Sequence, residues 1–303
     1  MNGAPENSAP RVSVVLPVYN GERYLGEAID SVLAQTFRNR EIICVDDGST
    51  DGSFDILQRY RDRVRIIRQE NAGQGGARNT GANQARGEFL AFLDQDDRWY
   101  PQKLEREVAC LEGDRQAVLV YSNSDRMDES GRVTQVGATL AERASALVSP
   151  LGRLIGEGLV LPSSLLVRRE AFARAGGFDA HLRGFEDFDL SARLKQLGTF
   201  VFLPESGLCY RCHAAGFSRA GGMAVIQSRE RFLLKMRTLY AGDVEKERLI
   251  RAMLAECYAD WGMAELRAGN RRGGRGFLWR SIRHNPAKVR TYARLLRAWG
   301  IPG

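Results

Sequence analysis

Short apolar runs alternate with amphipathic stretches through the first half of the chain. The runs are rich in β-branched residues and end at turn residues, which predicts buried strands. Between them, apolar positions recur every three or four residues, which predicts helices. The predicted strands are 12–16, 41–45, 64–68, 89–93 and 118–121, and the predicted helices are 24–34, 54–60, 77–85 and 101–111. This alternation indicates an α/β fold with a Rossmann-like, mostly parallel sheet flanked by helices.

The second half is less regular, and residues 125–158 carry little pattern. The elements predicted after them are a strand over 161–167, helices over 170–175 and 187–197, strands over 199–203 and 208–213, and only helices from 225 onward. We therefore expect a sheet domain over 1–220, with halves of about 11–123 and 124–220. A C-terminal helical extension over 221–303 should follow it.

Charge is concentrated in the helical extension. From Leu266 to Gly303 there are nine arginines, one lysine and no acid, so this segment carries +10 while the whole chain carries +7. Interleaved with Trp279 and Trp299, such a segment suits an anionic membrane surface; a docking or dimerisation helix is the alternative. The chain shows no apolar signal segment and no apolar run of 18 residues, so we expect a cytoplasmic protein, peripheral at the inner face of the membrane.

The residues that follow the predicted strands form the candidate site, because parallel sheets bind ligands beyond the carboxyl ends of their strands. Asp94, Asp96 and Asp97 follow one strand directly, and three carboxylates so close together repel one another unless a cation compensates. Mg²⁺ and Mn²⁺ prefer such oxygen ligands. An Asp-x-Asp pair is also common in surface turns, so the pattern alone leaves both interpretations open.

Four further features have both a structural and a chemical interpretation. Asp46-Asp47 can form a turn or contact a nucleotide, and the Gly-rich segment 71–76 before Arg78 can approach a ligand closely. Glu186-Asp187 opens a helix, where acids are favoured, and can also supply a general base. His213 can be a metal ligand or a structural histidine. Cys209 and Cys212 lack the second pair that a zinc site needs, so we expect reduced thiols.

Taken together and in order, these motifs resemble the family-2 inverting glycosyltransferases of the GT-A fold. The matching segments are SVVLPVYNGERYLGEAIDSVLAQT, VDDGSTDGS, NAGQGGARNTGANQARGEFLAFLDQDD, LLVRREAFARAGGFD, GFEDFDL, and YRCH with Ser218 after it. They run from about Arg11 to Ser218, roughly two-thirds of the chain.

The resemblance implies a nucleotide-sugar half over 11–123 and an acceptor half over 124–220. The implied donor-binding residues are Pro17, Val18, Tyr19, Glu22, Asp46, Asp47, Arg78, Asp94, Gln95, Asp96 and Arg211. The implied ligands for Mn²⁺ or Mg²⁺ are Asp96, Asp94 and His213, with Asp96 the expected direct ligand. Asp187 would be the catalytic base, with Glu186 beside it, although which of the two takes the proton stays open.

The activity that the resemblance implies is a metal-dependent, inverting transfer of a sugar from a nucleoside-diphosphate sugar, with a UDP-sugar favoured. The acceptor would be a hydroxyl of a saccharide or lipid-linked saccharide, in the synthesis of a cell-surface polysaccharide or glycoconjugate. Two alternatives remain at this stage: a sugar nucleotidyltransferase, and an inactive nucleotide-binding scaffold. The basic tail alone prompts nucleic-acid binding, but the sequence contains no module for it, so no nucleic-acid partner is expected.

Overall fold

The computed structural model describes residues 9–139, 149–157, 160–213 and 222–287, together with Tyr292 and Leu295. Two compact units divide the chain: one contains residues 1–180 and 186–215, and the other contains 181–185 and 216–303. The predicted domain boundary at 220 lies outside the described residues.

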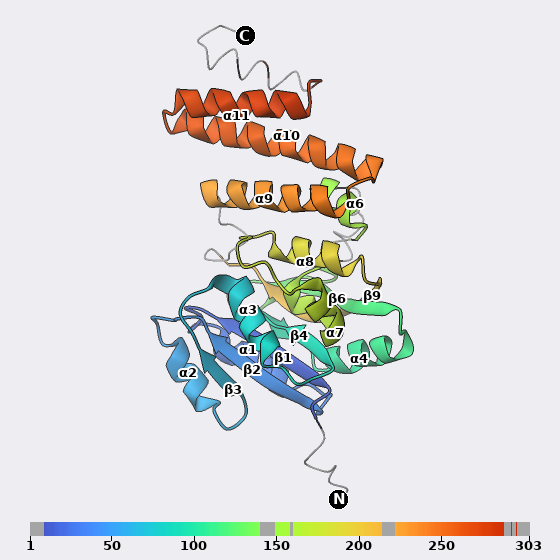
Figure 1. Cartoon of the computed structure of the whole chain (residues 1–303). Coiled ribbons are helices and arrows are strands. Elements are labelled where there is room, and N and C mark those ends of the chain that lie inside the picture. The colour runs from blue at the N-terminus through green and yellow to red at the C-terminus, as the bar shows by residue number, and fades with distance from the viewer. Residues whose placement is uncertain are drawn as a thin grey trace, which may run out of the picture. The chain divides into compact units, whose positions relative to one another are not determined.

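The first unit is built on one mixed sheet (Figure 1). Its strands are β1 Val12–Val18, β2 Arg40–Asp46, β3 Arg65–Arg68, β4 Phe89–Phe92, β5 Arg98–Trp99, β6 Ala117–Met127, β7 Val133–Gln135, β8 Leu165–Arg168 and β9 Thr199–Arg211. They lie in the order β3-β2-β1-β4-β8-β6-β9-β5, and β7 pairs with β6. Within the described residues, β1 to β4 run parallel, as the sequence predicts, and β6 and β9 are also parallel.

The second half of the sheet departs from the mostly parallel prediction. Strand β8 is antiparallel to both β4 and β6, and β5 is antiparallel to β9. The predicted strands 199–203 and 208–213 are one continuous strand, β9, which crosses the proline and glycine between them with shifts in register. Residues 161–164 do not extend the strand as predicted; Pro162–Ser164 form a 3₁₀ turn, η1, before β8.

Helices cover both faces of this sheet, and the two faces of β1 show why its whole sequence is apolar. Val14 and Leu16 pack in one core cluster with α1 and α4, whereas Val15 packs in the other with α3, α7 and α8. The helices of the unit are α1 Leu25–Leu33, α2 Ser53–Arg59, α3 Gly73–Asn83, α4 Lys103–Gly113, α6 Pro150–Ile155, α7 Arg169–Ala175 and α8 Glu186–Leu194.

The glycines of the Gly-rich segment lie in a helix and not in a loop. Helix α3 begins at Gly73, earlier than predicted, and contains Gly75 and Gly76. A Cβ on Gly75 would lie 3.3 Å from the Cα of Ala180, and one on Gly81 would lie 2.4 Å from Val15. The glycines therefore allow α3 to pack closely against its neighbours, and this packing places Arg78 near the sheet edge.

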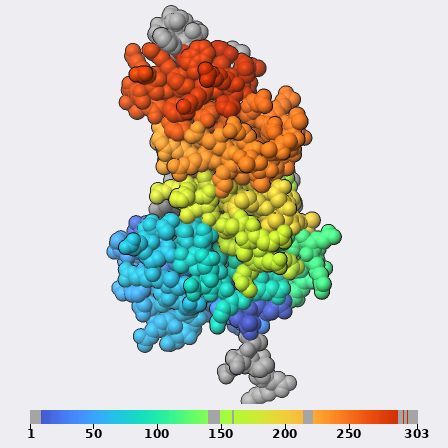
Figure 2. All heavy atoms as spheres, in the orientation of Figure 1, coloured from blue at the N-terminus to red at the C-terminus, as the bar shows by residue number. Residues whose placement is uncertain are grey.

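The second unit contains the long helices α9 Met223–Leu239, α10 Val244–Arg267 and α11 Arg271–His284. Helices α10 and α11 pack along their length, and their atoms form one continuous mass in Figure 2. A Cβ on Gly262 would lie 2.9 Å from the carbonyl oxygen of Gly274, so small residues permit this close approach. The rings of Trp261 and Phe277 stack at 4.3 Å. Among the described residues, no helix has the length and apolarity needed to cross a bilayer.

Candidate functional site

The loop after β4 lies at the carboxyl edge of the parallel strands, where the sequence places the site. Its backbone is fixed on both sides. The side chain of Gln95 accepts a hydrogen bond from the Tyr19 amide and donates one to the Tyr19 carbonyl, each at 2.9 Å. The Asp94 amide donates to Ser163 Oγ at 3.1 Å. Gln95, predicted to bind the donor, thus ties this loop to the end of β1.

Arg78 joins the Asp-x-Asp loop to the predicted base region. Its Nη2 lies 2.5 Å from Asp94 Oδ1, and its Nη1 lies 3.6 Å from Glu186 Oε1. The side chain is 2% exposed, and its Nε and Nη1 have no hydrogen-bond partner among the described residues. Burial alone would lower the pKa of Arg78, but the charges of Asp94 and Glu186 outweigh it and raise that pKa.

Asp187 has the electrostatic environment of a base that works near neutral pH. Burial first, and then the negative charge of Glu186, raise the pKa of Asp187 to about 7. The Phe188 amide donates a hydrogen bond to Asp187 Oδ1 at 2.8 Å, which holds the carboxylate at the start of α8. Asp189, two residues further along α8, pairs with Arg193 instead.

Asp96 and His213 meet at the other end of the loop. His213 Nε2 lies 2.8 Å from Asp96 Oδ2, and the His213 ring packs 5.4 Å from that of Tyr24. Burial and the charge of Asp94 raise the pKa of Asp96, an effect that the hydrogen bond from His213 opposes. The pKa of the buried Asp97 is raised well above its usual value by burial and by both other aspartates.

The crowded carboxylates of this loop show whether a divalent cation fits there. No three of the described His, Cys, Asp and Glu side chains form a cation-binding group, and Asp94 faces Arg78. However, Mg²⁺ usually keeps several waters and takes one or two protein carboxylates plus substrate phosphates. Asp96 and Asp94, with His213 beside Asp96, fit that mode. The negative charges of the two carboxylates repel each other, and a bound cation would relieve this repulsion.

The resemblance implies that Arg211 binds the donor, but in the structure its guanidinium contacts groups of the protein. Nε donates to the Asp96 carbonyl at 2.8 Å, and Nη2 lies 2.6 Å from Glu27 Oε2. Nη1 donates to the carbonyls of Asp128 and Glu129, each at 3.3 Å. The side chain is 1% exposed. In this arrangement Arg211 is a support for the loop, not a free cation facing a ligand.

The predicted nucleotide-binding residues at the ends of β1 and β2 are placed together, but several are already engaged. The buried Asp46 accepts from the Ser49 amide and pairs with Arg68 at 3.0 Å. Asp47 accepts from Gln69 Nε2 at 2.7 Å and from the Ala72 amide at 2.8 Å. Their predicted contacts with a donor base stay predictions.

This edge of the site also contains Glu22, Pro17, Val18 and Tyr19. Glu22 accepts a hydrogen bond from the Gly52 amide at 2.8 Å, so it joins the loop after β1 to the start of α2. Pro17 and Val18 are buried within β1. The ring of Tyr19 is 47% exposed, which makes it the apolar surface of this group that a nucleotide base can reach.

Sequence reasoning missed Glu27 and the role of Asp97. Asp97 Oδ1 accepts a hydrogen bond from the Arg211 amide at 3.0 Å, so it is a buried anchor for β9. Glu27 occupies the first turn of α1, where the helix dipole favours an acid, and it shows no other signal. Its two arginine partners are 71 and 184 residues away along the chain, which no local pattern reveals.

Comparisons with known proteins identify the family of this chain. The model of glycosyl transferase family 2 matches residues 13–174. An uncharacterized glycosyltransferase of Nostoc sp. is 34% identical over 242 residues, which are 77% of this chain and 75% of that protein. Another from Rickettsia prowazekii is 35% identical over 68% of this chain, and the match spans 65% of its length, slightly under two-thirds.

A solved structure supports the fold. The crystal structure of residues 1–349 of Staphylococcus aureus TarS in complex with UDP-GlcNAc aligns with 95% of this chain and 89% of that chain. The TM-score is 0.70 at 20% sequence identity, which identifies the shared GT-A fold. With the family model covering more than half of the sequence, the chain belongs to glycosyl transferase family 2.

Proposed function

We propose that the chain transfers a sugar from a nucleoside-diphosphate sugar to an acceptor hydroxyl, with inversion at the anomeric carbon. The observation that carries the proposal is the placement of Asp187, with a pKa raised to about 7, beside a Glu186–Arg78–Asp94 chain that reaches the Asp-x-Asp loop. A base and a pyrophosphate-binding loop are thereby linked through one buried arginine.

The proposed mechanism is a single in-line displacement. Asp187 accepts the proton of the acceptor hydroxyl as its oxygen attacks the anomeric carbon, and the nucleoside diphosphate leaves from the opposite face. With its pKa raised to about 7, Asp187 can take this proton near neutral pH. One carboxylate suffices for inversion, because no covalent sugar–enzyme intermediate is needed.

Asp96 and Asp94 are the residues that would hold a divalent cation, with His213 supporting Asp96. When bound there, Mn²⁺ or Mg²⁺ would neutralise the diphosphate and stabilise its departure. Arg78 Nε and Nη1, which lack hydrogen-bond partners among the described residues, can each donate a hydrogen bond to a phosphate or base oxygen.

A UDP-sugar is the favoured donor, and TarS, which shares the fold, was crystallised with UDP-GlcNAc. The favoured acceptor is a saccharide or lipid-linked saccharide. Calorimetric titration with UDP, dTDP and GDP, with Mn²⁺ and with EDTA, tests the proposal. We expect metal-dependent binding of one diphosphate, and at least about a tenfold weaker affinity in Asp96→Ala, since even indirect metal partners contribute that much. Failure of all three diphosphates to bind would contradict it.

Contact with an anionic membrane is a further part of the proposal. Helix α11 carries five arginines and no acid, and its Trp279 is 51% exposed. Arginine stems and a tryptophan ring on one helix suit the interface of an anionic bilayer. Flotation with vesicles that contain phosphatidylglycerol or only phosphatidylcholine tests this contact; equal behaviour with both would contradict it.

A further inference from the structure

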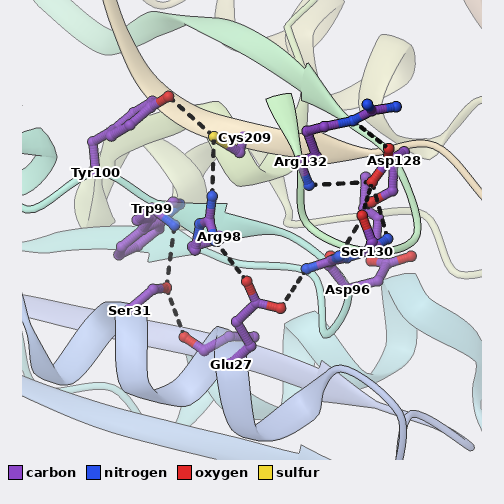
Figure 3. A network of polar contacts seen from close by, with 12 residues as sticks. Glu27, Ser31, Asp96, Arg98, Trp99, Tyr100, Asp128, Ser130, Arg132 and Cys209 are labelled. Atoms are coloured by element: carbon purple, nitrogen blue, oxygen red, sulfur yellow. Dashed lines mark hydrogen bonds and ion pairs between the residues drawn. The ribbon is translucent and has the colours of Figure 1, made fainter. Parts of the chain in front are cut away.

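Glu27 connects two arginines that approach it from different parts of the sheet. Its Oε1 lies 2.8 Å from Arg98 Nη1, and its Oε2 lies 2.6 Å from Arg211 Nη2. Figure 3 shows the Glu27 carboxylate pointing from α1 toward Arg98 and the loop that holds Asp96. One carboxylate therefore separates two guanidinium groups, which would repel each other without it.

Arg211 transmits this contact to the Asp-x-Asp loop through two different groups. Its Nε holds the carbonyl oxygen of Asp96 at 2.8 Å, and its backbone amide holds Asp97 Oδ1 at 3.0 Å. His213, two residues further along, reaches Asp96 Oδ2. The orientation of the Asp96 peptide and the position of His213 thus depend on the same buried side chain.

The turn between β6 and β7 covers this ion pair. The carbonyls of Asp128 and Glu129 accept from Arg211 Nη1. Gly131 has a φ of +83°, and a Cβ there would lie 3.6 Å from both Arg211 Nη1 and Glu27 Oε1. The ring of Tyr24 lies 4.3 Å from the Arg211 guanidinium carbon on another side. Arg211 therefore has fixed partners on several sides, of which Glu27 supplies the negative charge to the guanidinium.

We propose that Glu27, through its ion pair with Arg211, is a positioning residue that fixes the Asp96–Asp97 turn for binding of the nucleotide-sugar donor. This inference rests on the proposed function. Without the charge of Glu27, Arg98 and Arg211 face each other unshielded, and Arg211 shifts together with the Asp96 carbonyl. In this proposal Glu27 acts through Arg211 and not through a contact of its own with donor or acceptor.

The test is Glu27→Gln, which keeps the shape of the side chain and removes its charge. We expect UDP in the presence of Mn²⁺ to bind roughly tenfold more weakly, the loss typical of one charge-assisted hydrogen bond. In the transfer assay, KM for the donor should rise by the same factor while kcat changes less than about threefold. Arg211→Lys should also weaken binding, and the double variant should lose less than the two single losses combined, because the pair acts as a unit.

Glu41→Gln is the matched control. Glu41 also pairs with an arginine, Arg86, at 3.0 Å and accepts from Ser13, but it lies at the beginning of β2, far along the strand from the site. We expect a similar loss of thermal stability and unchanged UDP affinity. Glu27→Gln with wild-type UDP affinity and wild-type donor KM would overturn the proposal.

Failure of the proposed function itself would be distinguishable. If the wild-type chain binds none of the diphosphates, amide hydrogen exchange over residues 95–98 reads the positioning without a ligand. Faster exchange in this segment in Glu27→Gln than in Glu41→Gln would support the positioning role. Equal exchange in the two variants would overturn it.

Discussion

Arg78 and Arg211 lie at the two ends of the Asp-x-Asp loop, and they differ in how many of their donors the protein uses. Each side chain is at most 2% exposed, and each meets a carboxylate. Every guanidinium nitrogen of Arg211 has a partner. Arg78 Nε and Nη1 have no hydrogen-bond partner among the described residues, although Nη1 stays within ion-pair range of Glu186.

This difference distinguishes Arg211, which supports the loop, from Arg78, which has donors left for a ligand. A buried donor without a hydrogen bond costs free energy, so a water or a ligand oxygen that supplies the missing acceptor is favoured there. A fully satisfied guanidinium gains nothing from a ligand and would lose contacts by turning toward one. The two arginines, which the sequence presents as equivalent donor contacts, therefore have different expected roles, and substitutions can show whether the distinction holds.

The largest expected effect is at the proposed base, Asp187, which follows the Glu186 that Arg78 contacts. Asp187→Asn keeps the hydrogen bond from the Phe188 amide but cannot take a proton, so transfer should fall by about 10²–10⁴-fold. UDP affinity measured by calorimetry should stay within about twofold, since Asp187 does not contact the diphosphate in the proposed mechanism. Asp189→Asn, which loses the pair with Arg193 on the same helix, is the control and should keep transfer within a few fold. Full activity in Asp187→Asn would exclude its role.

The two arginines themselves should respond differently to lysine. Arg211→Lys loses several buried hydrogen bonds that one ammonium group cannot replace, so we expect about 2 kcal/mol less stability. For a chain of 303 residues, with an unfolding entropy of about 2.1 cal/mol/K per residue, that corresponds to a melting temperature roughly 3 °C lower by calorimetry. Arg78→Lys keeps a cation near Asp94 and should lower the melting temperature less, while UDP affinity falls roughly tenfold. A larger loss of melting temperature in Arg78→Lys than in Arg211→Lys would contradict the different roles of the two arginines.

The smallest expected effect is a shift in pH dependence. A carboxylate base works when ionised, so its raised pKa means that kcat/KM rises with pH, is half-maximal at about pH 7, and levels off above. Glu186→Gln removes the negative charge that contributes to this pKa, so the midpoint of the profile should move to lower pH. An unchanged midpoint would indicate that the titrating group is not Asp187.

Local sequence patterns predict much of the fold. The parallel strands β1 to β4, the helices between them and the helical character of the C-terminal region follow from apolar spacing and turn residues. The family resemblance and the acidic positions after β4 follow from ordered motifs. The reversal of β8 does not, because its short apolar run over residues 165–167 carries no signal of direction. Only the strands beside it decide whether it runs parallel or antiparallel. The glycines of α3 read as a loop because packing against Ala180 and Val15 is invisible locally.

The sequence by itself determined which chemical groups this chain brings to the edge of a sheet: Asp94, Asp96, Arg78, Asp187 and His213. Tertiary structure decided which of them remain available to a ligand. Arg211 pairs with Glu27, and Asp46 pairs with Arg68, so these charges are compensated within the protein. The sequence alone does not reveal either pairing. The physical reason is that hydrogen-bond satisfaction and pKa depend on neighbours in space, and here those neighbours lie up to 184 residues away along the chain.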